Sequence, residues 1–343
     1  MEMLIQRLVR NPHDEEALAY SHQAGAADPR SYAILLEKVG MATTDPAYAA
    51  HWLSESANVW AVTVGDAHHA ARTFMAAIEK DPTSTAAADR LATLYRERNE
   101  TKPLVALLEK LVKLLGPLVA QQDVRRRLVG IHEELGKLWA DPPLSRKDRA
   151  CENWRKVVEL DSNNVYAIYQ ARELLKELEQ FVEAIPLFAM EHNLVDDPER
   201  RLALYRDESA VRLRAGDGPG SSAALRHGRM LAPDDVALAQ EFGASITARL
   251  DLGEDVPAGE REEARAIFAS LAESYDGEYG LGYATSALRC VPGDDRAMQL
   301  ADHYAKGLNR VNDIRPLYAA YLAANPAGYL AVEARAQAAL APA

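Results

Sequence analysis

The stretch that decides the fold is Ala70–Pro82, which reads AARTFMAAIEKDP. Its apolar residues recur every three or four positions, so that Ala70, Phe74 and Ala77 share one face of a helix. The Asp-Pro dipeptide at its end favours a helix boundary, because proline disfavours the helical conformation in the residue before it. Small residues beside a large ring let a second helix approach closely. The stretch therefore predicts one member of a closely packed helix pair.

Dipeptides ending in proline recur along the whole chain. The first three are spaced 17 residues apart, and several later gaps are 34 to 36 residues. They are Asn11-Pro12, Asp28-Pro29, Asp45-Pro46, Asp81-Pro82, Gly116-Pro117, Asp197-Pro198, Ala232-Pro233, Val291-Pro292 and Asn325-Pro326. Asp and Asn cap helices well, and proline is tolerated in the first helical turn. A fixed period near 34 residues is typical of helix–turn–helix repeat arrays.

The residues between these dipeptides repeat as well. The matching positions are Leu91, Ala92 and Tyr95, then Leu135, Gly136 and Trp139, then Ala150, Trp154 and Val157, and finally Tyr318 before Pro326. On these residues the chain resembles the tetratricopeptide repeat (TPR) family. The resemblance implies an all-α fold, a right-handed α-solenoid of antiparallel helix pairs. We expect about 16–18 helices, and no segment has the pattern of a strand.

Repeat phase divides the chain into three predicted parts. Residues 1–46 follow the half-period and are predicted to form an N-terminal cap, and residues 47–215 form a regular TPR-like array. Residues 216–343 form an irregular array, and the phase is lost between 199 and 277. Pro233 and Pro292 lie 59 residues apart, about one repeat plus a further helix and loop. The glycine-containing loop near 250–260 is the predicted hinge.

Charge and composition exclude several classes of function. The formal net charge of −12 disfavours nucleic acid as a partner, because such binders need a basic surface. Cys151 and Cys290 are far apart in apolar contexts, which predicts buried thiols and a reducing, cytoplasmic setting. The N-terminus lacks the apolar region of a signal peptide, and no apolar run is long enough for a transmembrane segment.

The sequence lacks the motifs that are typical of metal, nucleotide and catalytic sites. His68 and His69 are adjacent and so diverge on a helix, and no His-Glu-x-x-His or Cys-x-x-Cys motif occurs. The glycines of 216–222 and of 277–282 lack the lysine or the strand that a nucleotide site needs. The acidic pairs at 234–235 and 294–295 follow prolines and are expected to cap helices. We therefore predict no metal, no cofactor and no catalytic site.

The resemblance implies that the first helix of each pair lines a concave groove. Four positions spaced three to four residues apart share that face. The candidate partner-binding residues there are Trp52, Glu55, Asp89, Arg96, Tyr166, Tyr169, Glu173 and Lys176. The alternative for the aromatic rings is packing against the neighbouring repeat. Acidic and aromatic residues replace the Lys, Asn and Arg with which one subgroup binds C-terminal carboxylates, so a partner segment with basic and apolar side chains is favoured.

The leading functional prediction is a non-catalytic scaffold or adaptor that binds a protein or peptide. The alternative is a ligand-responsive sensor whose solenoid curvature changes on binding. The Ala- and Arg-rich composition resembles repeat proteins of GC-rich bacteria such as myxobacteria. That resemblance implies a role in motility, polarity or envelope assembly, with a small GTPase or an assembly component as partner. The apolar C-terminal stretch 336–340 is expected to pack either on a further repeat or on a second copy of the chain, and the sequence does not decide between the two.

Overall fold

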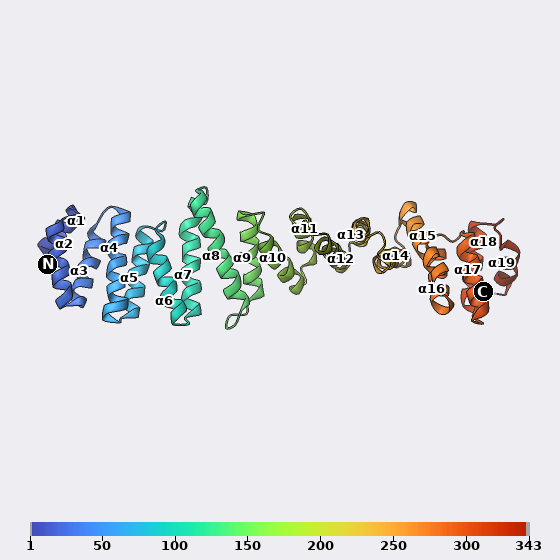
Figure 1. Ribbon diagram of the computed structural model, residues 1–343, viewed down its shortest axis with the longest axis horizontal. Coiled ribbons are helices and arrows are strands. Elements are labelled where there is room, and N and C mark those ends of the chain that lie inside the picture. The colour runs from blue at the N-terminus through green and yellow to red at the C-terminus, as the bar shows by residue number, and fades with distance from the viewer. Residues whose placement is uncertain (1, 341–343) are drawn as a thin grey trace. The chain divides into compact units, whose positions relative to one another are not determined.

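The structure is a computed structural model, and it describes residues 2–340. Over these residues it contains 19 α-helices, three short π or 3-10 segments and no strand (Figure 1). The predicted all-α class is confirmed. The 19 helices are one more than the upper end of the predicted range of about 16–18. The chain divides into two compact units, Met1–Leu178 and Glu179–Ala343.

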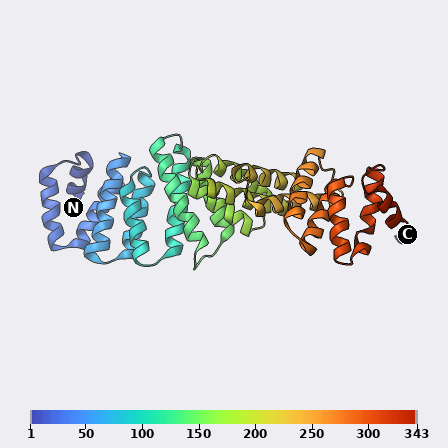
Figure 2. The same cartoon turned by 45° about the vertical axis from the view of Figure 1, so that its right-hand side comes forward.

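The first unit consists of consecutive helices joined by short loops. These are α1 (Glu2–Arg10), α2 (Glu15–Ala27), α3 (Pro29–Ala42), α4 (Pro46–Asn58), the π-helix η1 (Val59–Val64), α5 (Ala67–Lys80), α6 (Thr85–Glu97), α7 (Thr101–Leu115), the 3-10 turn η2 (Gly116–Leu118), α8 (Gln122–Ala140), α9 (Lys147–Leu160) and α10 (Val165–Glu177). Each helix packs on the next, and neighbours within this unit lie side by side in alternating directions (Figure 2). This is the packing of an α-solenoid.

Helix starts follow the capping chemistry that the sequence predicts. The Asp side chains before Pro29, Pro46 and Pro198 accept hydrogen bonds from backbone N–H groups in the first turn of α3, α4 and α12. Asp235 and Asp294 do the same for α14 and α17, which confirms the capping interpretation for one member of each acidic pair. These carboxylates therefore have a structural partner, the otherwise unsatisfied N–H groups of a helix N-terminus.

The core of the helix pairs is formed by the residues that the spacing singles out. Ala70, Phe74 and Ala77 are 0 to 2% exposed, and the Trp154 ring on α9 is equally buried. That ring lies against Gly136 of α8, where a Cβ would be 2.7 Å from the indole. Only a residue without a side chain permits this approach, so the Leu-Gly step of the repeat pattern has a packing reason.

A π-helix interrupts the face on which Trp52 and Glu55 were expected to continue. Helix α4 ends at Asn58, and η1 carries the next two positions of that face, Val59 and Val62. The wider turn changes the direction of the side chains, and Val62 is left 83% exposed. The predicted face therefore passes from an α-helix into a π-helix between its second and third positions.

The second unit repeats the pattern with one insertion. It consists of α11 (Phe181–His192), α12 (Pro198–Arg214), α13 (Gly218–Leu231), α14 (Val236–Asp251), α15 (Ala258–Ser274), α16 (Gly277–Cys290), α17 (Asp295–Gly307), the 3-10 turn η3 (Val311–Ile314), α18 (Arg315–Ala324) and α19 (Ala331–Ala339). The pairs α12/α13 and α15/α16 pack most closely, and α14 lies between them. Helix α14 and its following loop account for the long gap between Pro233 and Pro292.

The loop after α14, the predicted hinge, is anchored in the structure. Arg249 is 4% exposed and donates to Glu254 at 2.9 Å and to Glu260 at 2.8 Å, while Val256 is 2% exposed. Hinge motion at this loop stays a prediction, as do the domain limits at 46 and 215. Both cysteines are buried, as expected, and burial raises the pKa of the Cys290 thiol to about 11. Within the described residues, no helix is long and apolar enough to span a membrane.

Candidate binding pocket

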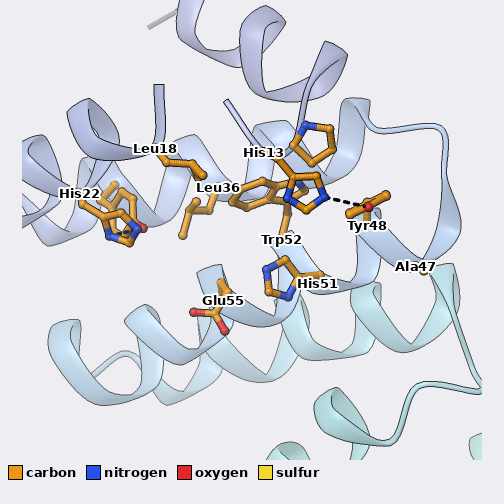
Figure 3. A pocket seen from close by; sticks show the side chains of 11 residues that line it. His13, Leu18, His22, Leu36, Ala47, Tyr48, His51, Trp52 and Glu55 are labelled. Carbon is orange, nitrogen blue, oxygen red and sulfur yellow. Dashed lines mark hydrogen bonds between the residues drawn. The ribbon is translucent and has the colours of Figure 1, made fainter. Parts of the chain in front are cut away.

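A pocket of about 550 Å³ lies in the first unit, between α2, α3 and α4 (Figure 3). We call it the α2–α4 pocket. Its lining residues are Pro12, His13, Leu18, His22, Tyr32, Leu36, Ala47, Tyr48, His51, Trp52 and Glu55. Its volume falls within the range of about 300–1,000 Å³ that is usual for ligand sites. Two of the predicted partner-binding residues, Trp52 and Glu55, meet here.

Trp52 forms the bridge between this pocket and the core. Its side chain packs in an apolar cluster with Ile5, Leu8 and Leu36, and only 6% of it is exposed. Its indole nitrogen is buried and has no hydrogen-bond partner among residues 2–340. The Trp52 ring therefore packs against α1 and α3 and also lines the pocket.

Histidines and tyrosines form most of the polar wall. A hydrogen bond of 3.1 Å joins His13 Nε2 to Tyr48 Oη, and one of 3.2 Å joins His22 Nδ1 to Tyr32 Oη. The His51 ring centroid is 5.5 Å from that of Trp52 (Figure 3). The two hydrogen-bonded pairs each join two different elements, whereas His51 and Trp52 are neighbours on α4. These contacts therefore hold the connection before α2, α2 itself and the two following helices around one hollow.

Glu55 is the only Asp, Glu, Lys or Arg in the lining. In the described part of the chain no cation pairs with it, and its charge acts on Tyr32 instead. Burial raises the pKa of Tyr32, and the negative Glu55 raises it further. The pocket thus presents one exposed carboxylate without an ion-pair partner among the described residues, beside tyrosine, histidine and tryptophan rings. Such a site attracts a cationic group, which can bind the carboxylate and contact the ring faces together.

The predicted residues on α6 lie elsewhere in the unit. Asp89 is exposed. Arg96 donates hydrogen bonds to both carboxylate oxygens of Glu134 on α8, at 2.7 and 2.9 Å. This pair joins two repeats at the surface. A partner that uses Arg96 has to compete with Glu134.

The four predicted residues of α10 form a separate patch, in which the two tyrosines are exposed and Glu173 and Lys176 are partly buried. Tyr166 and Tyr169 are 51% and 41% exposed, although Tyr166 also touches Trp154 edge-on. Glu173 and Lys176 bind each other at 3.1 Å. The structure therefore divides the predicted site residues into the α2–α4 pocket, the α6 pair and the α10 patch. Their role in partner binding stays a prediction.

Several lining residues were missed from the sequence. His13, His22, Tyr32 and Tyr48 come from the segment around α1–α4, where the 17-residue half-period gave no helix pair on which to align a groove. The signal that was available is compositional, since histidine and aromatic residues are dense between 13 and 52. Within residues 2–340 no group of three or more His, Cys, Asp or Glu is placed to hold a metal ion.

Comparison with known proteins gives matches at the level of structure only. No protein-family model matches the chain, and no curated protein does. Among solved structures, YrrB, titled a TPR protein with an unusual peptide-binding site, is 17% identical with a TM-score of 0.32, covering 56% of this chain and 90% of YrrB. MamA is 17% identical with a TM-score of 0.33, covering 60% of this chain and 91% of MamA.

A tetratricopeptide repeat protein from Parabacteroides merdae is 13% identical with a TM-score of 0.31, covering 85% of this chain and 98% of that protein. These TM-scores are below 0.5 and the identities below 25%. The assignment to an α-solenoid of TPR-like helix pairs therefore rests on the packing described above, and no functional conclusion rests on these matches.

Proposed function

We propose that this chain is a non-catalytic interaction scaffold that binds a segment of a partner protein in the α2–α4 pocket. The observation that carries the proposal is the carboxylate of Glu55, which has no counter-ion in the described structure and stands in a pocket walled by aromatic rings. A role in bacterial motility, polarity or envelope assembly stays a prediction from composition.

The chemistry of the pocket selects the partner segment. A lysine or arginine of the segment donates hydrogen bonds to Glu55, and an arginine also stacks on the rings beside it. An apolar neighbour in the segment fills the part of the pocket lined by Leu18 and Leu36. The partner therefore needs a basic residue next to an apolar one. The acidic and aromatic residues at the predicted groove positions favour the same kind of segment.

Photo-crosslinking identifies the partner and tests the site. A photoreactive amino acid replaces Tyr48, which lines the pocket, or Tyr20, which is exposed outside it. The proposal predicts a crosslink to one defined partner segment from position 48 and none from position 20. A synthetic peptide of that segment should bind the unmodified protein, and a peptide with its basic residue replaced by glutamine should bind at least tenfold more weakly.

Removing the charge of Glu55 tests the same contact from the side of this protein. Glu55→Gln keeps the shape of the side chain and should weaken peptide binding about tenfold or more, whereas Glu97→Gln on α6, exposed outside the pocket, should not. Trp52→Ala is a poor test, because this buried ring also supports the core. Equal binding by the two glutamine variants overturns the proposal.

A further inference from the structure

A second hollow lies wholly within the second unit, over α13 and between α12 and α14. We call it the α12–α14 groove, and its volume is about 620 Å³. We propose that this groove binds an amphipathic helix of a partner, with apolar side chains on its inner face and a basic residue near each end. This inference goes beyond the α2–α4 pocket, because it concerns a different unit and a different binding mode.

The walls of the groove are two helices that run in the same direction. Helix α13 packs on both α12 and α14 and connects them, so the two walls are parallel. Each wall presents residues spaced by three and four, which is one helical face. The wall residues are Ser209, Ala210 and Leu213 on α12, and Ala244, Ser245 and Ala248 on α14.

Small side chains on the walls create the hollow. Ala244 and Ala248 are exposed, and Leu225 of α13 forms part of the floor. Two facing rows of mostly small residues form a channel into which the side-chain ridge of a third helix fits. An extended segment turns every second side chain away from such a channel. The shape therefore favours a helix with apolar residues at i, i+3 or i+4, and i+7.

Apolar side chains at one end of the groove have no protein surface over them. Leu213 is 61% exposed and Leu252 is 78% exposed, and both line the groove where α12 and α14 end. Exposed leucines that rim an apolar hollow are the usual mark of an interaction surface. A helix lying in the groove covers both.

Charged residues at the two ends of the groove indicate which kind of residue the bound helix carries near each of its own ends. At the N-terminal end Arg206 is shared by two carboxylates, Asp235 and Glu241, each at 3.1 Å, so that this cluster is negative. At the C-terminal end the rim carboxylate is Glu254, whose partner Arg249 lies beneath it with a side chain only 5% exposed. A basic residue of the partner therefore shares Glu241 with Arg206 at one end and Glu254 with Arg249 at the other.

The length of the groove along α14 sets the spacing in the ligand. Glu241 starts the groove along α14, and Leu252 ends it eleven residues later. At 1.5 Å per residue this is about 16 Å, roughly three turns of helix. The bound helix therefore carries its two basic residues about eleven positions apart, with the apolar anchors between them.

The test uses a fluorescent alanine-based helical peptide as the probe. It has leucines on one face and two lysines eleven positions apart, and its binding to the full chain is measured by anisotropy. One control peptide has the lysines replaced by glutamates, and a second has the leucines scattered around the helix. The inference predicts saturable binding of the probe, at least tenfold weaker binding of the first control and no binding of the second.

Protein variants locate the binding. Ala248→Phe fills the groove and should weaken binding of the probe at least tenfold, whereas Ala266→Phe, exposed on α15 outside the groove, should not. Circular dichroism checks that both variants stay folded. Glu55→Gln should leave probe binding unchanged, which separates this site from the α2–α4 pocket. Absence of saturable binding, or equal binding by the two phenylalanine variants, overturns the inference.

Discussion

Single glycines decide how closely the helices of a pair approach. Gly136 and Gly130 lie on the same helix, α8, but on different faces. A Cβ at position 136 would be 2.7 Å from the Trp154 ring, whereas a Cβ at position 130 would meet no heavy atom within 4 Å. Because Trp154 is 1% exposed, its ring has no free space into which to move. Substitutions at the two positions therefore distinguish the packing role of a glycine from its conformational cost in a helix.

Gly136→Ala should lower the free energy of unfolding of the first unit by about 1–3 kcal/mol, because the added methyl overpacks the contact with Trp154. Gly130→Ala should raise it by roughly 0.5–1 kcal/mol, because alanine loses less entropy in a helix. Urea unfolding followed by circular dichroism measures both. Two substitutions that change stability in the same direction and by the same amount would contradict the packing argument.

At the scale of elements, a buried charge network joins three helices of the second unit. Glu208 on α12 is 7% exposed and accepts hydrogen bonds from His192 of α11 at 2.9 Å and from Arg212 at 2.8 Å. Arg212 also donates to Asp217, which caps α13. Burial by itself raises the pKa of Glu208, but the hydrogen bonds from His192 and Arg212 outweigh it, and the net pKa is lowered.

Glu208→Gln should reduce the stability of the second unit by about 1–3 kcal/mol at pH 7, because its buried partners lose an ionised acceptor. A carboxyl with a lowered folded-state pKa stabilises the fold above its unfolded-state pKa, near 4.5, and loses this contribution as the pH falls through the folded-state value. The difference between the variant and the natural protein should therefore be largest above about pH 5 and shrink towards pH 3.

Urea unfolding at pH 7, 5 and 3.5 measures this dependence. Glu273→Gln is the matched control, since Glu273 binds Arg296 in a solvent-exposed pair. Its effect should stay within about 0.5 kcal/mol. A difference between Glu208→Gln and the natural protein that does not change with pH would exclude the network as its cause.

For the whole molecule, the chain has two compact units, each with its own apolar core. Stability in repeat arrays is a sum of local terms, because each helix pair contacts only its neighbours. A core substitution should therefore act mainly on its own unit. Phe242, which is 0% exposed at the centre of the second unit, offers the clearest case.

Phe242→Ala should destabilise its surroundings by about 3–5 kcal/mol, because it leaves a large cavity. Hydrogen exchange measured by mass spectrometry should show faster exchange in α13–α16, with little change in α4–α9. The reciprocal control is Phe74→Ala, a ring buried to the same degree in the first unit, which should reverse the pattern. Equal acceleration across both units would mean that they unfold as one cooperative block.

The sequence by itself determined the all-α class and many of the helix starts and inner faces. Asp28 and Asp45 cap helices where the Asp-Pro spacing predicts, and Phe74 is buried where the small-residue pattern predicts. These features depend on residues within one or two turns of each other, so a local pattern is sufficient to specify them.

Only the tertiary structure decided where the candidate sites lie. The α2–α4 pocket brings His13, Tyr32 and Trp52 together from three elements, and its character depends on the absence of a described counter-ion for Glu55. The α12–α14 groove depends on how α12 and α14 pack on the helix α13 that connects them. Such sites arise from distances between elements, which the periodicity within each helix does not encode, and from which charges find partners once the helices pack.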